Sequence, residues 1–479
     1  MELVFDRSRP GRRGMVLDPL DVPQSSLPDA LCRRQAAELP ELSELDVVRH
    51  FTRLSQRNVG VDSTFYPLGS CTMKYNPKVA EAVAGLTGFT GLHPHLSSVP
   101  VYEPCCQGAL ALIYDTERLL AEIAGMRAVS LQPMAGAHGE LAGVLLIAAY
   151  HRDKGNGKDT ILIPDSAHGT NPASAAIAGF KVQPVPSGPD GTIHLDRFLE
   201  CLDDRVAGVM LTCPNTHGLF EPEVRAIADR AHEMDALMYY DGANLNAIVG
   251  KCRPGDLGFD VMHFNLHKTF GTPHGMGGPG SGPVGVGDRL LPFLPAPRVV
   301  LKNDIFTFAT PEKSIGKMAP FFGNFLIAVR AYAYIRCLGD EGLKAVSEHA
   351  VLNANYIWAR LRNAYQSAFD GRFMHECVFT ASPQAEHGVH AIDIAKGLID
   401  RGFHPPTIYF PLTVKESLMI EPTETESKEA MDAFCDAMLE IADLVLRDPD
   451  SLRAAPVTTP VGRLDEVKAA RELDCACIA

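Results

Sequence analysis

The sequence has no apolar run long enough to cross a membrane. Its longest such run, Leu141 to Tyr150 with only Gly143 interrupting it, falls well short of the roughly 20 residues that a membrane-spanning helix needs. The basic stretch Arg7 to Arg13 is flanked by acidic residues and no apolar segment follows it, which disfavours a secretory signal peptide. We therefore expect a cytoplasmic protein with no membrane segment.

Positive charge is also scarce. Lys and Arg number 44 against 58 Asp and Glu, for a formal net charge of −14. Clustered Lys and Arg bind phosphate backbones, so this balance argues against a nucleic-acid partner. Hydrophobic residues make up 46% and charged residues 21%, close to globular averages, so neither disorder nor a fibrous class is indicated. A chain of 479 residues is long enough for two or three domains.

Cysteine is present but is not arranged as a disulfide framework. The twelve cysteines are scattered along a long chain, which suits a reducing compartment. Cys105 and Cys106 are adjacent, and Cys475 and Cys477 form a C-x-C; the sequence leaves a redox role of either pair open. The C-x-C has no nearby His to complete a metal site, so we predict no metal centre.

Apolar runs alternate with helical patterns between residues 110 and 290. Turn residues or helix-like segments bound each run, and the predicted strands are Ala128–Gln132, Thr160–Ile163, Gly208–Thr212, Leu237–Tyr240 and Val261–Phe264. Strands that alternate with helices form a mostly parallel sheet covered on both faces, so we predict an α/β fold.

The chain is expected to have four parts. Residues 1–90 form an N-terminal arm and active-site or interface segment, with a helical pattern around Glu44 to Gln56, and residues 91–335 form the large domain. A small C-terminal α/β domain follows at 336–450, and a tail at 451–479. Two helices, Phe321–Leu338 and Gly342–Tyr365, are expected to lead into the small domain. The small domain itself is expected to contain the strands Glu376–Thr380 and Thr407–Tyr409 and a helix from Ser427 to Arg447.

The most informative lysine is Lys268, in the stretch Asn265 to Gly271. This polar turn comes directly after the strand candidate Val261–Phe264, and a glycine-rich segment up to Gly287 follows it. An isolated lysine is usually a surface residue. A lysine in a turn after a buried strand, however, is where an amine that forms a Schiff base with pyridoxal phosphate (PLP) would sit.

Asp241 and Ala243 end the strand candidate that precedes this one. A carboxylate at the carboxyl end of a parallel strand points into the crevice where such sheets bind ligands. There it can keep the pyridine nitrogen of PLP protonated, and Ala243 is small enough for the ring to rest against it. The alternative for Asp241 is a helix N-cap at a strand-to-helix turn.

Gly136 and Ala137 lie in a small-residue loop between the strand Ala128–Gln132 and an apolar helix. Small residues before a helix let backbone N–H groups approach a phosphate, whose charge the helix dipole favours. The pattern is neither G-x-G-x-x-G nor a P-loop, so nucleotide binding is disfavoured.

Two more strand ends carry polar turns, with His168 and Asn215. His168 follows Thr160–Ile163 and could lie on the cofactor face opposite Ala243, or it could be a turn histidine satisfied by backbone. Asn215 follows Gly208–Thr212 and could donate to the phenolate oxygen of PLP. Five successive strand ends therefore carry polar or glycine-rich turns.

The order of phosphate loop, His, Asn, Asp-x-Ala and His-Lys resembles fold-type I PLP-dependent transferases, the aspartate aminotransferase superfamily. Within it, the chain resembles the glycine dehydrogenase (decarboxylating) family, the P-protein of the glycine cleavage system, and most closely subunit 2 of its split form. The segments that carry this resemblance are Ser63–Pro77, Gln132–Glu140, Asp165–Ser174, Asn265–Gly278 and Met419–Ser427.

The resemblance implies a role for each candidate residue. Lys268 would anchor PLP and carry a proton, Asp241 would pair with the pyridinium, and Asn215 would meet the phenolate oxygen. His168 would stack on the ring, with His138 as its rival. Those expected to cradle the phosphate are Gly136, Ala137 and His267. The Ser63–Pro77 segment would either line the entrance to the site or be a structural arm against a partner subunit.

The resemblance also implies a reaction and partners. Glycine would lose CO2 on PLP, and its aminomethyl group would pass to the lipoyl group of the H-protein. A fused P-protein is roughly twice as long, so this chain would need a homologous, lysine-free subunit 1 in an (αβ)2 heterotetramer.

Two alternatives remain open from the sequence. The chain could be another fold-type I enzyme, such as an amino-acid decarboxylase or a cysteine desulfurase, although no cysteine stands in the context of a persulfide carrier. It could also be a catalytically silent scaffold subunit, which the presence of Lys268, Asp241 and His168 together disfavours.

Overall fold

The computed structural model describes residues 2–35, 37–275 and 280–472, and the chain divides into two compact units, Met1–Ser63 and Thr64–Ala479. The first unit contains η1 (Asp29–Leu31) and α1 (Glu44–Ser55). Helix α1 begins at Glu44 because Ser43 and Asp46 form a reciprocal capping box, which satisfies backbone donors of the first turn. The helical pattern expected around Glu44 is confirmed.

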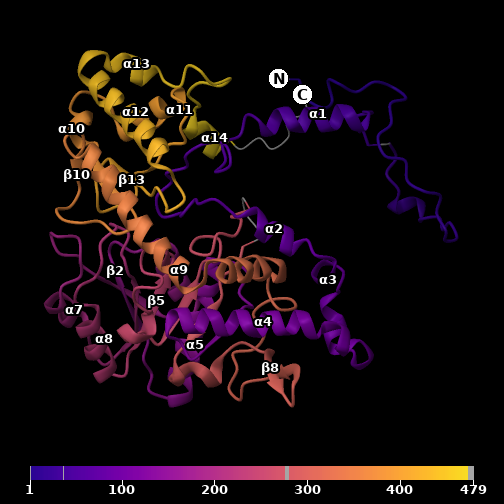
Figure 1. The fold of residues 1–479 in the computed structure, drawn as a ribbon, viewed down its shortest axis with the longest axis horizontal. Helices are drawn as coiled ribbons and strands as arrows, with labels where there is room; N and C mark the ends of the chain where they lie inside the picture. Colours follow the sequence, from indigo (N-terminus) through magenta and orange to yellow (C-terminus); the bar gives the residue numbers. More distant parts are fainter. Residues whose placement is uncertain (1, 36, 276–279, 473–479) are drawn as a thin grey trace. The chain divides into compact units, whose positions relative to one another are not determined.

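The second unit contains a seven-stranded sheet in the order β1-β7-β6-β5-β4-β2-β3. Two of its strands, β2 and β5, are labelled in Figure 1. Every neighbouring pair is parallel except those that involve β7, which is antiparallel to both of its neighbours. The strands are β1 (Ala128–Ser130), β2 (Thr160–Pro164), β3 (Lys181–Val185), β4 (Val206–Thr212), β5 (Leu237–Gly242), β6 (Val261–Phe264) and β7 (Val284–Val286). The mostly parallel sheet and its five predicted strands are confirmed.

Two strands of this sheet were not predicted, for different reasons. Strand β3 lies at the edge and only Val185 of its five residues is buried, so it has no continuous apolar run. Strand β7 is three residues, Val-Gly-Val, within the glycine-rich segment after Lys268. Neither sequence pattern is typical of a strand.

Side chains alternate between two cores on the two faces of the sheet. On β5, Tyr239 packs into the core with α5 (Gly136–Lys154), whereas Tyr240 packs into the core with α4 (Glu103–Ala124) and α8 (Val224–Glu233). Helices α6 (Thr170–Ile177) and α7 (Leu195–Cys201) complete the βα alternation. The sheet is thus covered on both faces, as predicted.

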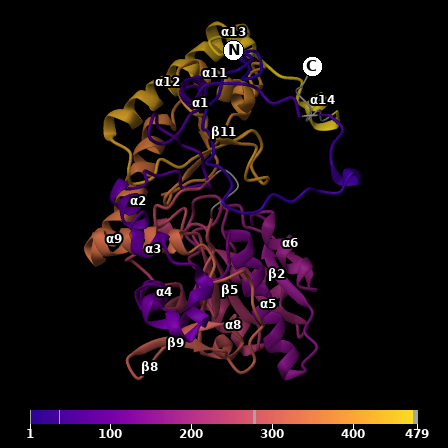
Figure 2. The same ribbon diagram turned by 90° about the vertical axis from the view of Figure 1, so that its right-hand side faces the viewer.

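A smaller antiparallel sheet, in the order β10-β11-β13-β12, has its own core with α11 and α12. It lies at the other end of the second unit, beyond α9 (Figures 1 and 2). Its elements are β10 (Gln366–Ser367), β11 (Cys377–Thr380), α10 (Ser382–Ala385), α11 (Ala391–Asp400), β12 (Thr407–Ile408), β13 (Ser417–Ile420), α12 (Lys428–Arg447) and α13 (Pro449–Ala454). The predicted strands near Glu376 and Thr407 and the predicted helix after Ser427 are confirmed, while β13 was missed.

Helix α9 (Phe325–Leu361) leads from the large sheet to the small one. Gly339, at φ 64° and ψ −166°, interrupts its helical backbone, so α9 corresponds to the two predicted helices on either side of that residue. The remaining elements are α2 (Lys78–Ala84), α3 (Thr87–Thr90), η2 (Pro94–Ser98), η3 (Pro100–Tyr102), η4 (Leu245–Ala247), η5 (Pro254–Leu257), η6 (Asp288–Phe293), β8 (Arg298–Lys302), β9 (Ile305–Ala309) and α14 (Glu466–Arg471).

The structure does not test several of the expectations from the sequence. The boundaries of the four expected parts remain predictions. Cys475, Cys477, Gly277 and Gly278 lie outside the described residues. Among the residues that the structure describes, no helix is both long and apolar enough to pass through a bilayer.

Candidate active site

A pocket of about 180 Å³ lies at the carboxyl ends of the central strands. Parallel strands that end at one edge of a sheet bring their following turns together, which is where such sheets bind ligands. The lining residues are Ser70, Gly136, Ala137, Glu140, His168, Thr170, Thr212, Thr216, Asp241, Ala243, Asn244, His263, Asn265, His267 and Lys268. Seven of the eight predicted site residues are among them, all but Asn215.

Lys268 lies in the turn that follows β6. Leu266 and Phe270 on either side are fully buried and anchor the turn, which leaves the half-buried Lys268 facing the pocket. Its Nζ donates a hydrogen bond to the backbone carbonyl of Ser70 at 2.8 Å. The lysine amine is therefore positioned by a segment almost 200 residues away in the sequence.

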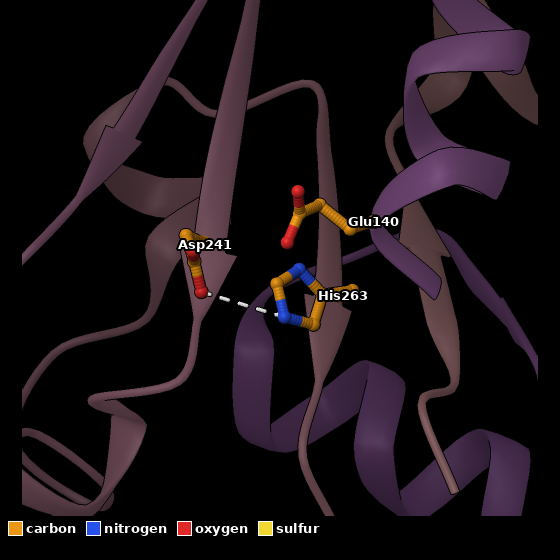
Figure 3. Close-up of side chains that lie close together, drawn as sticks. All are labelled: Glu140, Asp241 and His263. Carbon is orange, nitrogen blue, oxygen red and sulfur yellow. Dashed lines mark ion pairs between the residues drawn. The ribbon is translucent and has the colours of Figure 1, made fainter. Parts of the chain in front are cut away.

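Asp241 is buried at the end of β5 and three groups contact its carboxylate. The Nδ2 of Asn171 donates at 3.0 Å, the backbone N–H of Ala243 at 2.9 Å, and the Nε2 of His263 lies at 3.4 Å (Figure 3). Burial opposes its ionisation, but these three neighbours outweigh burial and hold the pKa of Asp241 below its ordinary value. Asp241 is thus an ionised carboxylate that can meet a protonated ring nitrogen.

Glu140 is a second buried carboxyl, which was not among the predicted site residues. It lies on α5 and its Oε2 accepts a hydrogen bond from the hydroxyl of Thr170 at 2.9 Å, while Oε1 has no hydrogen-bond partner in residues 2–35, 37–275 and 280–472. Burial, and then the charge of Asp241, raise its pKa to about 7. The signal available in the sequence was an acidic residue that opens the apolar run Leu141 to Tyr150.

His168 lies in the loop after β2, with its ring exposed at the pocket. Its Nδ1 is 2.9 Å from the Thr170 hydroxyl, so the same hydroxyl joins it to Glu140. Desolvation of the ring, and then the charge of Lys268, lower the pKa of His168, although Asp241 opposes them. His138, its rival, does not line the pocket, and its Nδ1 accepts from the backbone N–H of Met134 at 3.2 Å.

The N-terminus of α5 and His267 form the polar end of the pocket. Helix α5 begins at Gly136 without a side-chain cap, which leaves backbone donors of its first turn for a ligand. A Cβ at Gly136 would overlap Oδ1 of Asn265, so only glycine fits there. Within the described residues, the Nδ1 of His267 is buried without a hydrogen-bond partner. Burial, followed by the charge of Lys268, lowers the pKa of His267 to about 3. These donors fit a bound phosphate group.

Asn215 is the one predicted residue that the structure does not bring to the pocket. Its amide donates to the carbonyl of Gly191 at 2.9 Å and to Glu221 at 2.7 Å, and its Oδ1 accepts from the backbone at residues 217 and 219. All of its hydrogen-bonding capacity is therefore used to fold the turn after β4. The pocket wall there is formed instead by Thr212 and Asn244. Each has a buried side-chain oxygen with no hydrogen-bond partner among the described residues.

Comparisons with known proteins agree with this geometry. Residues 346–450 match the model of the glycine dehydrogenase C-terminal domain, and residues 138–278 match aminotransferase class-V. The probable glycine dehydrogenase (decarboxylating) subunit 2 of Chlorobium chlorochromatii is 54% identical over 482 residues, which cover 99% of each chain. The protein of that name in Bacillus licheniformis is 53% identical over 476 residues, which cover 98% of this chain and 97% of the relative. The chain belongs to the glycine dehydrogenase (decarboxylating) subunit 2 family.

Solved structures similar to this subunit 2 family member have the same fold. A glycine decarboxylase P-protein in inhibitor-bound form aligns with a TM-score of 0.72 at 22% identity, over 87% of this chain and 93% of that one. A cysteine desulfurase from Escherichia coli aligns with a TM-score of 0.61 at 17% identity, over 82% and 98% of the chains. The predicted fold class, the α/β fold of fold-type I PLP-dependent transferases, is confirmed.

The segment from Thr64 to Pro77 both lines the pocket and holds the second unit of this family member together. Ser70 is a lining residue, as the first of its two expected roles requires. Lys74 is fully buried, with its Nζ 2.6 Å from Glu424, 2.7 Å from Oδ1 of Asn246 and 2.8 Å from the carbonyl of Thr269. Lys74 therefore ties this segment to the rest of the second unit, and a contact of the segment with a partner subunit stays a prediction.

Proposed function

We propose that this chain binds PLP through a covalent link to Lys268. The observation that carries the proposal is the convergence of Lys268, Asp241 and the uncapped N-terminus of α5 on one pocket. Bound PLP supplies an electron sink for the electron pair left when the bond between the carboxylate and Cα of an amino acid breaks.

The residues of the pocket have distinct roles in this proposal. The ionised Asp241 holds the ring nitrogen protonated, His168 stacks on one face of the ring and Ala243 contacts the other. Backbone donors at Gly136 and Ala137, together with His267, bind the phosphate. Because the Asn215 amide is used elsewhere, the hydroxyl of Thr212 takes its place as the donor to the phenolate oxygen.

We further propose that the substrate is glycine and that the reaction is its decarboxylation, with transfer of the aminomethyl group to the lipoyl group of the H-protein. Relatives at 53 to 54% identity over nearly the whole chain carry the name glycine dehydrogenase (decarboxylating) subunit 2, which supports this substrate. The same name supports a homologous, lysine-free subunit 1 as partner, in an (αβ)2 heterotetramer. A cytoplasmic location stays a prediction.

Exchange of 13C-labelled bicarbonate into the carboxyl group of glycine tests the proposal. We expect exchange only when the chain, subunit 1 and lipoylated H-protein are all present. The variant Lys268→Ala should lose both exchange and the visible absorbance of bound PLP, whereas Lys251→Ala, at an exposed lysine paired with Glu348, should keep both. Turnover of cysteine or of aromatic amino acids, with none of glycine, would contradict the proposed substrate; a protein that stays colourless with PLP and subunit 1 would contradict PLP binding.

A further inference from the structure

A second group of titratable side chains lies close to Lys268 and has no role in the proposed reaction. It consists of His375, Glu376 and Glu421, each of which is fully buried. Glu376 directly precedes β11, and Glu421 directly follows β13. Because Cys377, the first residue of β11, is paired with Ile420, the last residue of β13, the antiparallel register brings the two acids together at the same end of these strands. We call these three residues the buried acid cluster.

The two acids of the cluster hold the backbone of residues 70–72. The backbone N–H of Ser70 donates to Oε2 of Glu376 at 2.8 Å, and that of Thr72 donates to Oε2 of Glu421 at 2.8 Å. The hydroxyl of Thr72 donates to the other oxygen of Glu421. Ser70 and Thr72 have φ angles of 64° and 48°, which side-chain-bearing residues rarely adopt, so these bonds compensate a strained backbone.

The backbone of residues 70–72, which the two acids bind, also contacts Lys268. The carbonyl of Ser70 accepts the hydrogen bond from Nζ of Lys268, while the N–H of the same residue is bound to Glu376. Two hydrogen bonds through the backbone of Ser70 therefore connect the buried acid cluster to the lysine amine.

The buried acid cluster carries one negative charge that needs a cation nearby. The Nε2 of His375 lies 3.8 Å from a carboxyl oxygen of each acid. In the part of the chain that the structure describes, neither nitrogen of His375 has a hydrogen-bond partner. Burial lowers the pKa of His375 to about 3, so it is neutral. Burial, and then the charge of Glu421, raise the pKa of Glu376 well above its ordinary value, and burial also raises the pKa of Glu421. Two such acids side by side retain one proton between them, mainly on Glu376.

The charged and titratable groups that face the two acids come from several elements: Lys268, Lys74, Cys71 and Cys377. Burial raises the pKa of both thiols, so they are neutral. Lys74 is already paired with Glu424. Lys268 is therefore the cation that faces the remaining negative charge. On its other sides Lys268 faces Asp241 and the imidazoles of His168, His263, His267, His274 and His375.

We propose that Glu376 and Glu421 are positioning residues for Lys268: with one proton between them, the two acids hold the Ser70 carbonyl in place and keep one negative charge close to the lysine amine. The inference rests on the proposed function only in taking Lys268 as the residue that links PLP.

The pH dependence of PLP incorporation into the full-length apo-protein, followed by visible absorbance in the presence of subunit 1, tests the proposal. The free amine is the form that reacts, and a nearby negative charge favours its protonated form. Glu421→Gln removes that charge, so the pH of half-maximal rate should fall. Glu376→Gln replaces an acid that is already neutral, so this variant should move the pH of half-maximal rate much less. The control Glu117→Gln, at a buried acid of the large core, should not move it.

A purely structural role would lower the rate or the amount of incorporation at every pH without moving the midpoint. An unchanged midpoint in Glu421→Gln would thus overturn the proposal. Should that variant fail to fold, Thr72→Val keeps Glu421 but removes its hydroxyl donor, and the midpoint should move in the same direction by a smaller amount. A stoichiometric divalent cation in the wild-type protein, lost in Glu421→Gln, would also overturn it, because a cation would replace the shared proton. Failure of the wild-type protein to incorporate PLP would instead contradict the proposed function.

Discussion

Glu140 and Asp241 are two buried carboxyls of one pocket whose pKa values move in opposite directions. Carboxyl oxygens of the two, together with a nitrogen of His263, lie within 4.8 Å of one another (Figure 3). Asp241 receives hydrogen bonds from Asn171 and from the backbone, whereas the Oε1 of Glu140 has no partner. Below about neutral pH, one proton therefore resides on Glu140 and one negative charge on Asp241, which is the distribution that a protonated pyridine ring requires.

The stability of the protein should reflect the proton on Glu140. Its pKa rises from an ordinary value of 4.5 to about 7 on folding, so the folded chain binds a proton that the unfolded chain has released, and stability falls as pH rises through this window. In urea unfolding of the apo-protein, Glu140→Gln should gain stability relative to wild type between pH 5 and pH 8, by at most about 3 kcal/mol. Glu348→Gln, at an exposed ion pair, is the control and should show no such gain. A difference in the free energy of unfolding between Glu140→Gln and wild type that stays constant from pH 5 to pH 8 would refute the assignment of the proton to Glu140.

The ring of His168 should contribute to PLP affinity. His168→Ala removes an aromatic surface at the pocket and should weaken PLP binding about 10-fold, whereas His168→Phe keeps that surface and should bind within about 3-fold of wild type. His138→Ala should leave the affinity within the same limit, because its side chain does not line the pocket. Absorbance titration of the apo-proteins measures these affinities. A larger loss in His138→Ala than in His168→Ala would show that the stacking residue is His138.

The close packing at Gly136 predicts a specific steric effect. A methyl group there would overlap Oδ1 of Asn265, so Gly136→Ala should displace the start of α5 and weaken PLP binding at least about 10-fold. The double variant Gly136→Ala with Asn265→Ala should recover part of that loss. Gly169→Ala is the matched control, because a Cβ there meets nothing within 4 Å. Unchanged affinity in Gly136→Ala would mean that phosphate is not bound at this helix end.

Lys74 should contribute strongly to the stability of the second unit. Lys74 forms a buried ion pair with Glu424, so Lys74→Met leaves an uncompensated buried carboxylate. The variant should lose about 3 to 5 kcal/mol in the free energy of unfolding. The double variant Lys74→Met with Glu424→Gln should be considerably more stable than the single one. Lys428→Met, at an exposed pair with Asp432, should cost less than about 1 kcal/mol. Urea unfolding followed by circular dichroism measures all three, and a loss in Lys74→Met no larger than in Lys428→Met would contradict a structural role of the segment.

Local sequence patterns predicted five of the seven strands of the large sheet and seven of the fifteen residues that line the pocket. Strands β2, β4, β5 and β6 are short apolar runs bounded by turns, and a parallel sheet necessarily collects the turns after such strands at one edge. That is why Lys268, Asp241 and His168 could be placed together without coordinates. The exceptions lacked the pattern: β3 is an exposed edge strand, and β7 is three residues long.

What the sequence by itself determined was the order of strands and helices and the chemical types of the residues at the strand ends. Only the tertiary structure decided which atoms those residues face. It turned the Asn215 amide toward Gly191 and Glu221, brought Glu140 beside Asp241, and joined residues 70–72 to Glu376 and Glu421, some 300 positions later. The physical reason is that hydrophobic periodicity is a local property, whereas burial, hydrogen-bond partners and neighbouring charges depend on segments distant in the chain.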